Sequence, residues 1–354
     1  MAGTVHLFMV GNSNNISEIE SNLAQLVVTS PPYPMVQMWD DMFIKQNPEI
    51  ESFLNENPRM AFGAMHALLD EVWRECDRIL VDGGFVCINI GDAVRTMNEK
   101  FEMYPNHLRI LEFFYKRGYS VLPDIHWRKV TNAPNKFMGS GMYPCGAYVT
   151  YEHEYILIFR KGASRKFTEE EKKIRRESGY FWEERNVWFS DLWEIKGASQ
   201  SVLNIEGREK KAAFPFEIPY RLINMYSMKG DTVLDPFAGF GTTALAAMAS
   251  GRNSISVEIE NEIVDATLKK LGYAQRSLNK IIDNRIKGHV KFIDGLDDEA
   301  KTNCYQNIYH DFLVKTKQEA EIRIEKIEEF YKSNNTIVCM YGDSCQPKKV
   351  ISES

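Results

Sequence analysis

A short proline-rich loop is the first stretch of this sequence that is suited to chemistry. Residues 29–34 read Thr-Ser-Pro-Pro-Tyr-Pro and follow the apolar run Leu26–Val28, which predicts a short buried strand. Two consecutive prolines end such a strand, because each fixes φ and lacks an N–H group. The result is a stiff loop that presents the hydroxyl of Ser30 and the neighbouring backbone carbonyls.

The groups in this loop suit a planar ring that carries an exocyclic amine. A hydroxyl and carbonyls accept the hydrogens of an amine, and the ring of Tyr33 offers a face for stacking. We therefore take four residues of the loop as candidate catalytic residues, namely Ser30, Pro31, Pro32 and Tyr33. An ordinary proline-rich turn after a strand is the other interpretation of this stretch taken alone.

A second loop, in the C-terminal half, has the layout of a nucleotide-type site. The strand expected at 232–235 is followed by Pro-Phe-Ala-Gly-Phe-Gly-Thr-Thr, an alanine-rich helix, and a strand that ends at Glu258. Gly239 and Gly241 let the backbone approach a ligand, and the acid about 20 residues further on accepts hydrogen bonds from ribose hydroxyls. Neither the third glycine of a dinucleotide site nor the lysine of a triphosphate site follows Gly241.

The acid before this loop indicates the charge of the ligand. Asp235 is expected to aim its carboxylate into the pocket, where it would attract an amino group and repel a pyrophosphate. S-adenosylmethionine fits, because it combines an ammonium, a sulfonium, a ribose and an adenine. The candidate cofactor-binding residues of this part of the chain are Asp235, Pro236, Phe237, Gly239, Gly241, Thr242 and Glu258.

Together the two loops resemble the catalytic and cofactor motifs of the DNA amino-methyltransferases, which methylate N4 of cytosine or N6 of adenine. The catalytic motif precedes the cofactor motif, which resembles the circularly permuted β-group of that family. Further segments resemble the family in the same order, so that the matching part spans roughly 1–270; they are Arg78–Gly84, Asp124–Lys129, Tyr151–Tyr155, Asp191–Ile195 and Ala213–Ile223.

The resemblance implies further cofactor contacts at Asn12, Phe214 and Pro215. Asn12 stands where the family often has an aspartate beside the cofactor adenine. Lys210 and Lys211 stand before Phe214, near the methionine end of the cofactor, where the family commonly has His-Pro.

The resemblance also implies methyl transfer to a base that is flipped out of the duplex. An exocyclic amine is a weak nucleophile because its lone pair is delocalised into the ring. Ser30 Oγ and the Pro31 carbonyl would accept its hydrogens, and Tyr33 would stack on the base. Serine at the first motif position resembles the N4-cytosine subgroup, whereas Asp or Asn is commoner among N6-adenine enzymes.

We therefore expect an N4-cytosine DNA methyltransferase of the bacterial restriction–modification type. N6-adenine methylation, methylation of RNA or protein glutamine, and a cofactor- and DNA-binding protein without turnover are the alternatives. The expected partners are double-stranded DNA and a cognate restriction endonuclease.

A basic stretch followed by aromatic residues separates the two halves. Between residues 160 and 176, eight basic side chains stand against three acidic ones, and six aromatic residues follow between 180 and 193. This pattern suits phosphate contacts and base stacking. A solvated helix packed on a small aromatic core is the alternative. On the first interpretation, DNA would be contacted by Arg165, Lys166, Lys172, Lys173, Arg175 and Arg176.

The elements between these motifs predict an α/β protein with a Rossmann-like, mostly parallel sheet of seven strands and helices on both faces. Strands are expected at 4–10, 26–28, 85–90, 119–129, 155–159, 232–235 and 254–258. Helices are expected at 17–25, 61–80, 104–117, 217–228, 244–250, 261–271 and 311–331, and an irregular flap at 35–60.

Four regions follow from this pattern. They are a catalytic half at 1–160, a target-recognition region at 161–210, a cofactor-binding half at 211–272 and a mostly helical extension at 273–354. The extension is expected to cover the sheet, mediate a homodimer or join DNA recognition.

The composition is that of a soluble globular protein. Of the 354 residues, 44% are hydrophobic and 26% charged, and no apolar run is long enough to span a membrane. The six cysteines show no CxxC pair or metal-ligand spacing, so no metal site is expected. The cytoplasm is the expected location. The net charge of −6 leaves nucleic-acid binding to local basic patches.

Overall fold

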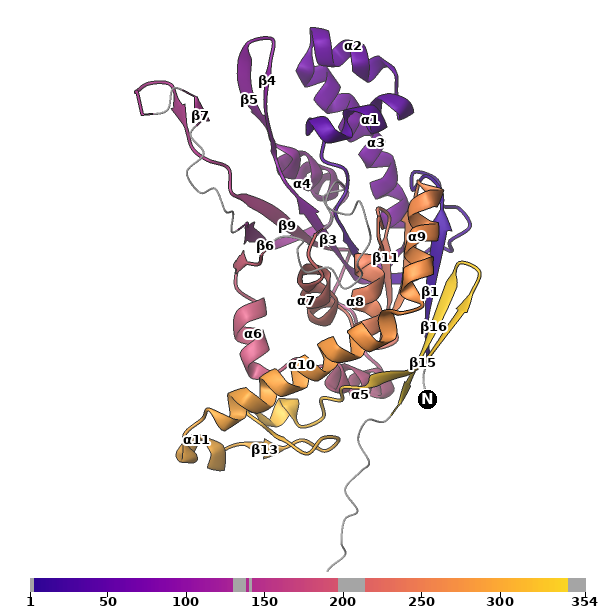
Figure 1. Ribbon diagram of the computed structural model, residues 1–354, viewed down its shortest axis with the longest axis vertical. Coiled ribbons are helices and arrows are strands. Elements are labelled where there is room, and N and C mark those ends of the chain that lie inside the picture. The colour runs from indigo at the N-terminus through magenta and orange to yellow at the C-terminus, as the bar shows by residue number, and fades with distance from the viewer. Residues whose placement is uncertain (1–2, 130–137, 140–141, 197–213, 343–354) are drawn as a thin grey trace, which may run out of the picture.

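A large sheet with helices on both faces forms the centre of the protein (Figure 1). The computed structural model describes residues 3–129, 138–139, 142–196 and 214–342. The ten strands of the sheet follow the order β10-β6-β9-β3-β2-β11-β12-β1-β16-β15. Seven of them are the expected ones: β1 (Gly3–Val10), β2 (Ala24–Thr29), β3 (Leu80–Ile90), β6 (Ser120–Arg128), β9 (His153–Arg160), β11 (Thr232–Asp235) and β12 (Asn253–Glu258).

Three strands extend the sheet beyond the seven that were expected. β10 (Leu192–Glu194) adds to β6, and the hairpin of β15 (Lys326–Ser333) and β16 (Thr336–Gly342) adds to β1. The helix expected at 311–331 is therefore wrong, and the extension is helical at 274–294 and 298–302 but not in its later part. β15 is an edge strand whose side chains are mostly exposed, so its charged residues resemble those of a solvated helix.

The segment before the third strand also differs from expectation. Residues 17–23 form turns instead of a helix. The expected irregular flap contains a short 3-10 helix η1 (Gln37–Trp39), α1 (Asp40–Gln46) and α2 (Glu49–Glu56). Pro48 and Pro58 are compatible with helices here, because each stands at the start of a helix, where its missing N–H is not needed.

Successive residues of the central strands face two separate apolar cores. Leu26 and Val28 face one core, and Val27 faces the other. The first core is closed by α7 (Glu217–Tyr226), α8 (Thr242–Ser250), α9 (Asn261–Leu271) and α10 (Ala274–Asp294). The second core is closed by α3 (Pro58–Ile79) and α4 (Asn106–Lys116).

The five central strands, β3, β2, β11, β12 and β1, are parallel to one another. Their carboxyl ends therefore meet at one edge of the sheet. The proline-rich loop leaves β2 and the glycine loop leaves β11, which are neighbours in the sheet. The fold thus places the two loops side by side, in the position where open α/β sheets bind ligands.

Hairpins and short helices surround this edge. The first helix of the insert, as we call residues 161–196 of the expected recognition region, lies away from it (Figure 1). The hairpin of β4 (Ala93–Met97) and β5 (Lys100–Tyr104) rises beside α1 and α2, and the short pair β7 (Met138–Gly139) and β8 (Ala147–Tyr148) lies next to it (Figure 1). α5 (Glu169–Glu177) lies at the opposite end of the molecule with α10 (Figure 1).

The C-terminal extension packs on the insert. α10 is followed by α11 (Asp298–Thr302), β13 (Tyr305–Gln306), β14 (Leu313–Val314) and the 3-10 helix η3 (Lys317–Glu319). Phe181, at the start of α6 (Trp182–Trp188), forms a third apolar cluster with residues of α10 and of the following segment. No helix of the described ranges has the length and apolarity to cross a membrane.

The Arg285–Glu184 pair between α10 and α6 is expected to fix the extension to the insert. Arg285 Nε and Nη2 donate to the two carboxylate oxygens of Glu184 over 2.7 and 2.8 Å, and both side chains are largely buried. Arg285→Met leaves the Glu184 charge without its partner, which is expected to lower the free energy of unfolding by about 3–5 kcal/mol. Urea unfolding measures this loss. Lys287→Met, at an exposed position of the same helix, should change stability by less than about 0.5 kcal/mol; equal losses in both variants would contradict the assignment.

Candidate active site

The proline-rich loop is held rigidly at the end of β2. Pro31, Pro32 and Pro34 are buried, whereas Ser30 and Tyr33 are half-buried. Asn106 holds the loop in place, because its buried amide donates to the carbonyls of Pro34 and Gly91 over 3.0 and 2.9 Å. The hydroxyl of Ser30 is therefore set in one place by a loop with little freedom.

Ser30 belongs to a buried polar network that the sequence analysis missed. Its Oγ lies 3.1 Å from the hydroxyl of Tyr33, which donates to Glu154 Oε2 over 2.8 Å. The amide of Asn89 donates to both Tyr33 Oη and Glu154 Oε2 over 2.7 Å. Lys129 forms an ion pair with the other oxygen of Glu154.

Burial, and then the neighbouring Glu154 carboxylate, raises the pKa of Tyr33 well above its usual value. The hydroxyl of Tyr33 therefore stays protonated. The signal that could have revealed Asn89 is its place as the polar residue in the apolar run of β3, where a buried amide needs partners. Glu154 carries the same signal at the start of β9.

The glycine loop has a backbone conformation that favours glycine. Gly239 has φ +49° and Gly241 has φ +70°, in the left-handed region that favours glycine. A Cβ atom at Gly241 would lie 3.1 Å from the ring of Phe8 and from the methyl group of Thr267. The Gly239 N–H donates to Glu258 Oε2 over 2.9 Å, so that the end of β12 supports the loop.

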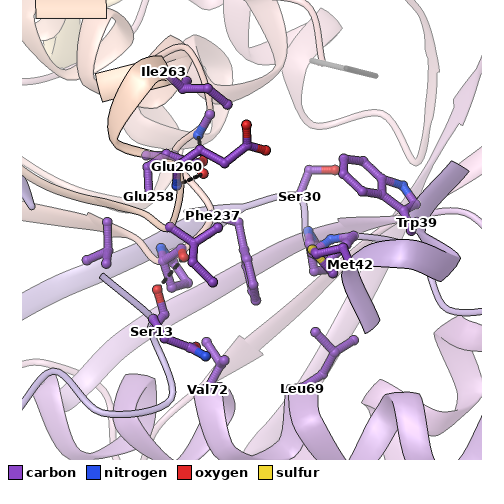
Figure 2. Close-up of a pocket in the computed structure, with 18 of the residues that line it drawn as sticks. Ser13, Ser30, Trp39, Met42, Leu69, Val72, Phe237, Glu258, Glu260 and Ile263 are labelled. Atoms are coloured by element: carbon purple, nitrogen blue, oxygen red, sulfur yellow. Dashed lines mark hydrogen bonds between the residues drawn. The ribbon is translucent and has the colours of Figure 1, made fainter. Parts of the chain in front are cut away.

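The two loops border one cavity, part of which is open to solvent. Figure 2 shows Glu258, Glu260 and Ile263 on one side and Ser30, Trp39 and Met42 on the other. Leu69 and Val72 of α3 form the floor in this view (Figure 2). The cavity thus joins a carboxylate end to the proline-rich loop across mostly apolar walls.

Most of the predicted site residues line this cavity. All four candidate catalytic residues do, and so do seven of the ten candidate cofactor residues, namely Asn12, Phe214, Pro236, Phe237, Gly239, Thr242 and Glu258. Asp235, Gly241 and Pro215 are not among the lining residues. One wall of the cavity is formed by Trp39, Met42, Phe43 and Gln46. These residues were not predicted, because the segment that forms α1 was expected to be irregular.

Asp235 ties the two loops together instead of facing the cavity, which corrects the expected orientation. Its buried carboxylate accepts hydrogen bonds from Thr29 Oγ1 over 2.7 Å and from the Phe237 N–H over 3.1 Å. Thr29 directly precedes Ser30, so the acid of one motif holds the start of the other. Burial raises the pKa of Asp235 to about 6.

The structure places the basic stretch at the opposite edge of the sheet. Arg165, Lys172, Arg175 and Arg176 line a second cleft beside the first residues of β2 and β3. Several of these cations are paired, since Arg165 contacts Asp231 and Glu171, Lys172 contacts Glu169, Lys173 contacts Glu177 and Arg176 contacts Glu321. Arg175 lies over the ring of Phe167, and Lys166 is exposed.

This placement favours the alternative of a solvated helix on an aromatic core. The phosphate contacts expected of these six residues stay a prediction. Residues 197–210 of the expected recognition region, and residues 211–213 at the start of the expected cofactor half, lie outside the described residues.

The fold and the paired motifs define a class of protein. Residues 24–269 match the family model N6_N4_Mtase, described as DNA methylase. The chain belongs to this DNA methylase family, as the resemblance of its motifs implied.

Two relatives share nearly half of their residues with it. The chain is 48% identical to the Type II methyltransferase M.MthZI of Methanothermobacter thermautotrophicus, over 98% of this chain and 97% of that protein. It is 47% identical to the Type II methyltransferase M.MjaI of Methanocaldococcus jannaschii, over 78% of this chain and 94% of that protein.

A solved structure supports the fold. A putative DNA modification methylase of Thermus thermophilus, in complex with S-adenosylmethionine, is 31% identical and superposes with a TM-score of 0.58. The match covers 77% of this chain and 96% of that protein. The expected α/β methyltransferase fold is confirmed, and the expected cofactor is confirmed at the level of the family. The circularly permuted order stays a prediction, because it is defined against other groups of the family.

The raised pKa of Asp235 predicts a pH-dependent stability. An acid whose pKa is higher in the folded protein binds its proton more tightly there than in the unfolded chain. Its contribution therefore favours folding below about pH 4 and is lost as the pH rises through about 6. With about 1.36 kcal/mol for each pKa unit, the loss is roughly 3 kcal/mol.

Asp235→Asn removes this titration and keeps an oxygen that accepts from Thr29. Urea unfolding at pH 4 and at pH 7 gives the free energy of unfolding of wild type and variant. From pH 4 to pH 7, the difference between the two proteins should change by roughly 3 kcal/mol in favour of the variant. Parallel pH profiles of the two proteins would show that Asp235 keeps an ordinary pKa.

Proposed function

We propose that this protein transfers a methyl group from S-adenosylmethionine to N4 of a cytosine that is flipped out of double-stranded DNA. The observation that carries the proposal is that Ser30 and the glycine loop border the same cavity. A methyl donor held by the glycine loop is thereby within reach of an amine held by the proline-rich loop.

The cavity fits an adenosyl cofactor by the donors and surfaces it presents. Trp39, Phe237 and Val72 supply apolar area for the adenine, and Glu258 supplies a carboxylate for the ribose hydroxyls. Each oxygen of Glu258 accepts one backbone N–H, from Gly239 and Glu260, and a carboxylate oxygen can accept a second hydrogen bond. When bound, the cofactor supplies a methyl group activated by a sulfonium.

The residues of the proline-rich loop prepare the amine. Ser30 Oγ and the Pro31 carbonyl accept its hydrogens, which makes the nitrogen more pyramidal and restores its lone pair. Tyr33 offers its ring to the extruded base, and stacking of this kind is worth about 1–3 kcal/mol for each base. An inactive binding protein is disfavoured, because it has no use for the buried network behind Ser30.

The choice of cytosine depends on Ser30 as the first residue of the motif. N6-adenine methylation is the second candidate, since the same cavity and network would serve an adenine amine. We further propose that the protein acts in the cytoplasm beside a cognate restriction endonuclease. The division into a catalytic half, a recognition region, a cofactor half and an extension, and a homodimer, remain predictions.

Product analysis tests the proposed function directly. Purified protein, S-adenosylmethionine and duplex DNA of mixed sequence should yield N4-methylcytosine after nucleoside digestion and mass spectrometry. Formation of N6-methyladenine instead would show that the target is adenine, and the proposed cofactor and mechanism would stand. Cofactor binding without either product would overturn methylation of DNA. Ser30→Ala should lower kcat about 100-fold or more, since it removes an acceptor that the transition state needs.

Glu258 is expected to carry much of the affinity for the cofactor. Glu258→Gln leaves one acceptor oxygen where the carboxylate had two, so a hydrogen bond to a charged group, worth about 1.5–3 kcal/mol, is lost. Isothermal titration calorimetry should show a Kd raised about 10- to 100-fold. Glu262→Gln, at an exposed position of α9, is the matched control and should bind as the wild type does. An unchanged Kd for Glu258→Gln would remove Glu258 from the cofactor site.

A further inference from the structure

The hydrogen bonds behind Ser30 have a fixed direction. A carboxylate only accepts, so the hydroxyl of Tyr33 must give its hydrogen to Glu154 Oε2, 2.8 Å away. A phenol has one hydrogen. The Ser30 hydroxyl, 3.1 Å from Tyr33 Oη, is therefore the donor in its contact with Tyr33. Asn89 agrees with this assignment, because its amide hydrogens reach Tyr33 Oη and Glu154 Oε2.

This direction decides what Ser30 offers to the cavity. With its hydrogen turned toward Tyr33, Ser30 Oγ keeps a lone pair for an amine hydrogen. Glu154 is only 6% exposed, and a buried carboxylate of this kind needs a partner charge, which Lys129 supplies. The series of hydrogen bonds thus begins at the cavity with an acceptor, Ser30 Oγ, and ends two hydrogen bonds later at the carboxylate of Glu154, which is paired with Lys129.

We propose that Ser30, Tyr33 and Glu154 form a proton relay that removes the proton which the target amine must lose. This inference rests on the proposed function, because it needs an amine at Ser30. It adds an acceptor for the proton, which the methyltransferase motifs alone do not supply, and it assigns a role to Glu154 on β9.

The atoms and charges of the step balance. The amine nitrogen forms a bond to the methyl carbon while the bond from that carbon to sulfur breaks, which leaves the positive charge on the amine. One N–H bond then breaks, and its proton goes to Ser30 Oγ. The hydrogen of Ser30 moves to Tyr33 Oη, and the hydrogen of Tyr33 moves to Glu154 Oε2. The methylated base is neutral, and Glu154 is protonated.

The surroundings of Tyr33 and Glu154 fit their roles in the relay. The high pKa of Tyr33 means that it passes a proton on and does not hold a phenolate. The ion pair with Lys129, whose side chain is 44% exposed, favours the return of Glu154 to the carboxylate with its proton released to solvent. Ser30 touches the substrate and is catalytic, whereas Tyr33 Oη and Glu154 act through it as positioning and relay groups.

Two substitutions separate the relay from packing. Tyr33→Phe keeps the ring, and with it stacking and the shape of the loop, but removes Oη. Glu154→Gln keeps an oxygen that accepts from Tyr33 but cannot take up a proton. Glu152→Gln, two residues away on the same segment, is the matched control for loss of a carboxylate.

The measurement is the rate of methyl transfer in a single turnover across pH, with saturating S-adenosylmethionine and DNA. Both relay variants should lose about 10²–10⁴ in rate, the range of general acid–base assistance. Their Kd for the cofactor should stay within about threefold of wild type, which also shows that they fold. Any pH dependence of the rate that comes from the carboxylate of Glu154 should be absent in Glu154→Gln.

The outcomes are distinguishable. Relay variants that bind the cofactor and transfer methyl groups at the wild-type rate, with the wild-type pH profile, would overturn the relay and leave the proposed function standing. A wild-type protein that methylates no base would overturn both. If Glu154→Gln does not fold, Tyr33→Phe decides alone, because a purely structural Glu154 predicts no loss of rate in Tyr33→Phe.

Discussion

The parallel pairing of β2 with β11 is the constraint on which the site depends. Val233 and Leu234 of β11 lie opposite Leu26 and Val27 of β2, so both strands end at the same level of the sheet. Their loops then border one cavity, although about 200 residues of sequence separate them. A shift of this register by one residue would exchange the side chains that face the two apolar cores. Burial of those cores therefore fixes the distance between the two motifs.

Most of the insert and of the C-terminal extension lies away from this edge of the sheet. α10 is joined to α6 through Arg285 and Glu184, and the last hairpin extends the sheet beyond β1. β10, at the end of the insert, pairs with the carboxyl-terminal residues of β6. Of the three roles expected for the extension, α10 takes part in covering one face of the sheet, and the homodimer and DNA recognition stay predictions. The cavity is instead lined by residues of α1, α3 and α9 together with the two loops.

The parts of the site that sequence could predict are those carried by one continuous stretch. The proline-rich loop, the glycine loop and the seven expected strands each have a local pattern, and all were found. Asn89 and Glu154 were missed because their importance lies in contacts with Tyr33, which no spacing in the sequence expresses. Asp235 was expected beside the glycine loop, as observed, but its expected orientation was wrong. Its partner Thr29 lies on a neighbouring strand that is far away in the sequence. The C-terminal hairpin was read as helix because its exposed edge strand carries the charges of a solvated surface.

The network behind Ser30 also bears on why a serine can serve at this position. A carboxylate accepts an amine hydrogen without carrying one of its own, and so does the oxygen of an amide. A serine brings a hydrogen that would point at the amine unless another group accepts it. Tyr33 is that group here, and it can accept because Glu154 takes its own hydrogen. The buried carboxylate therefore turns a hydroxyl into an acceptor, and the same orientation gives the departing proton its route.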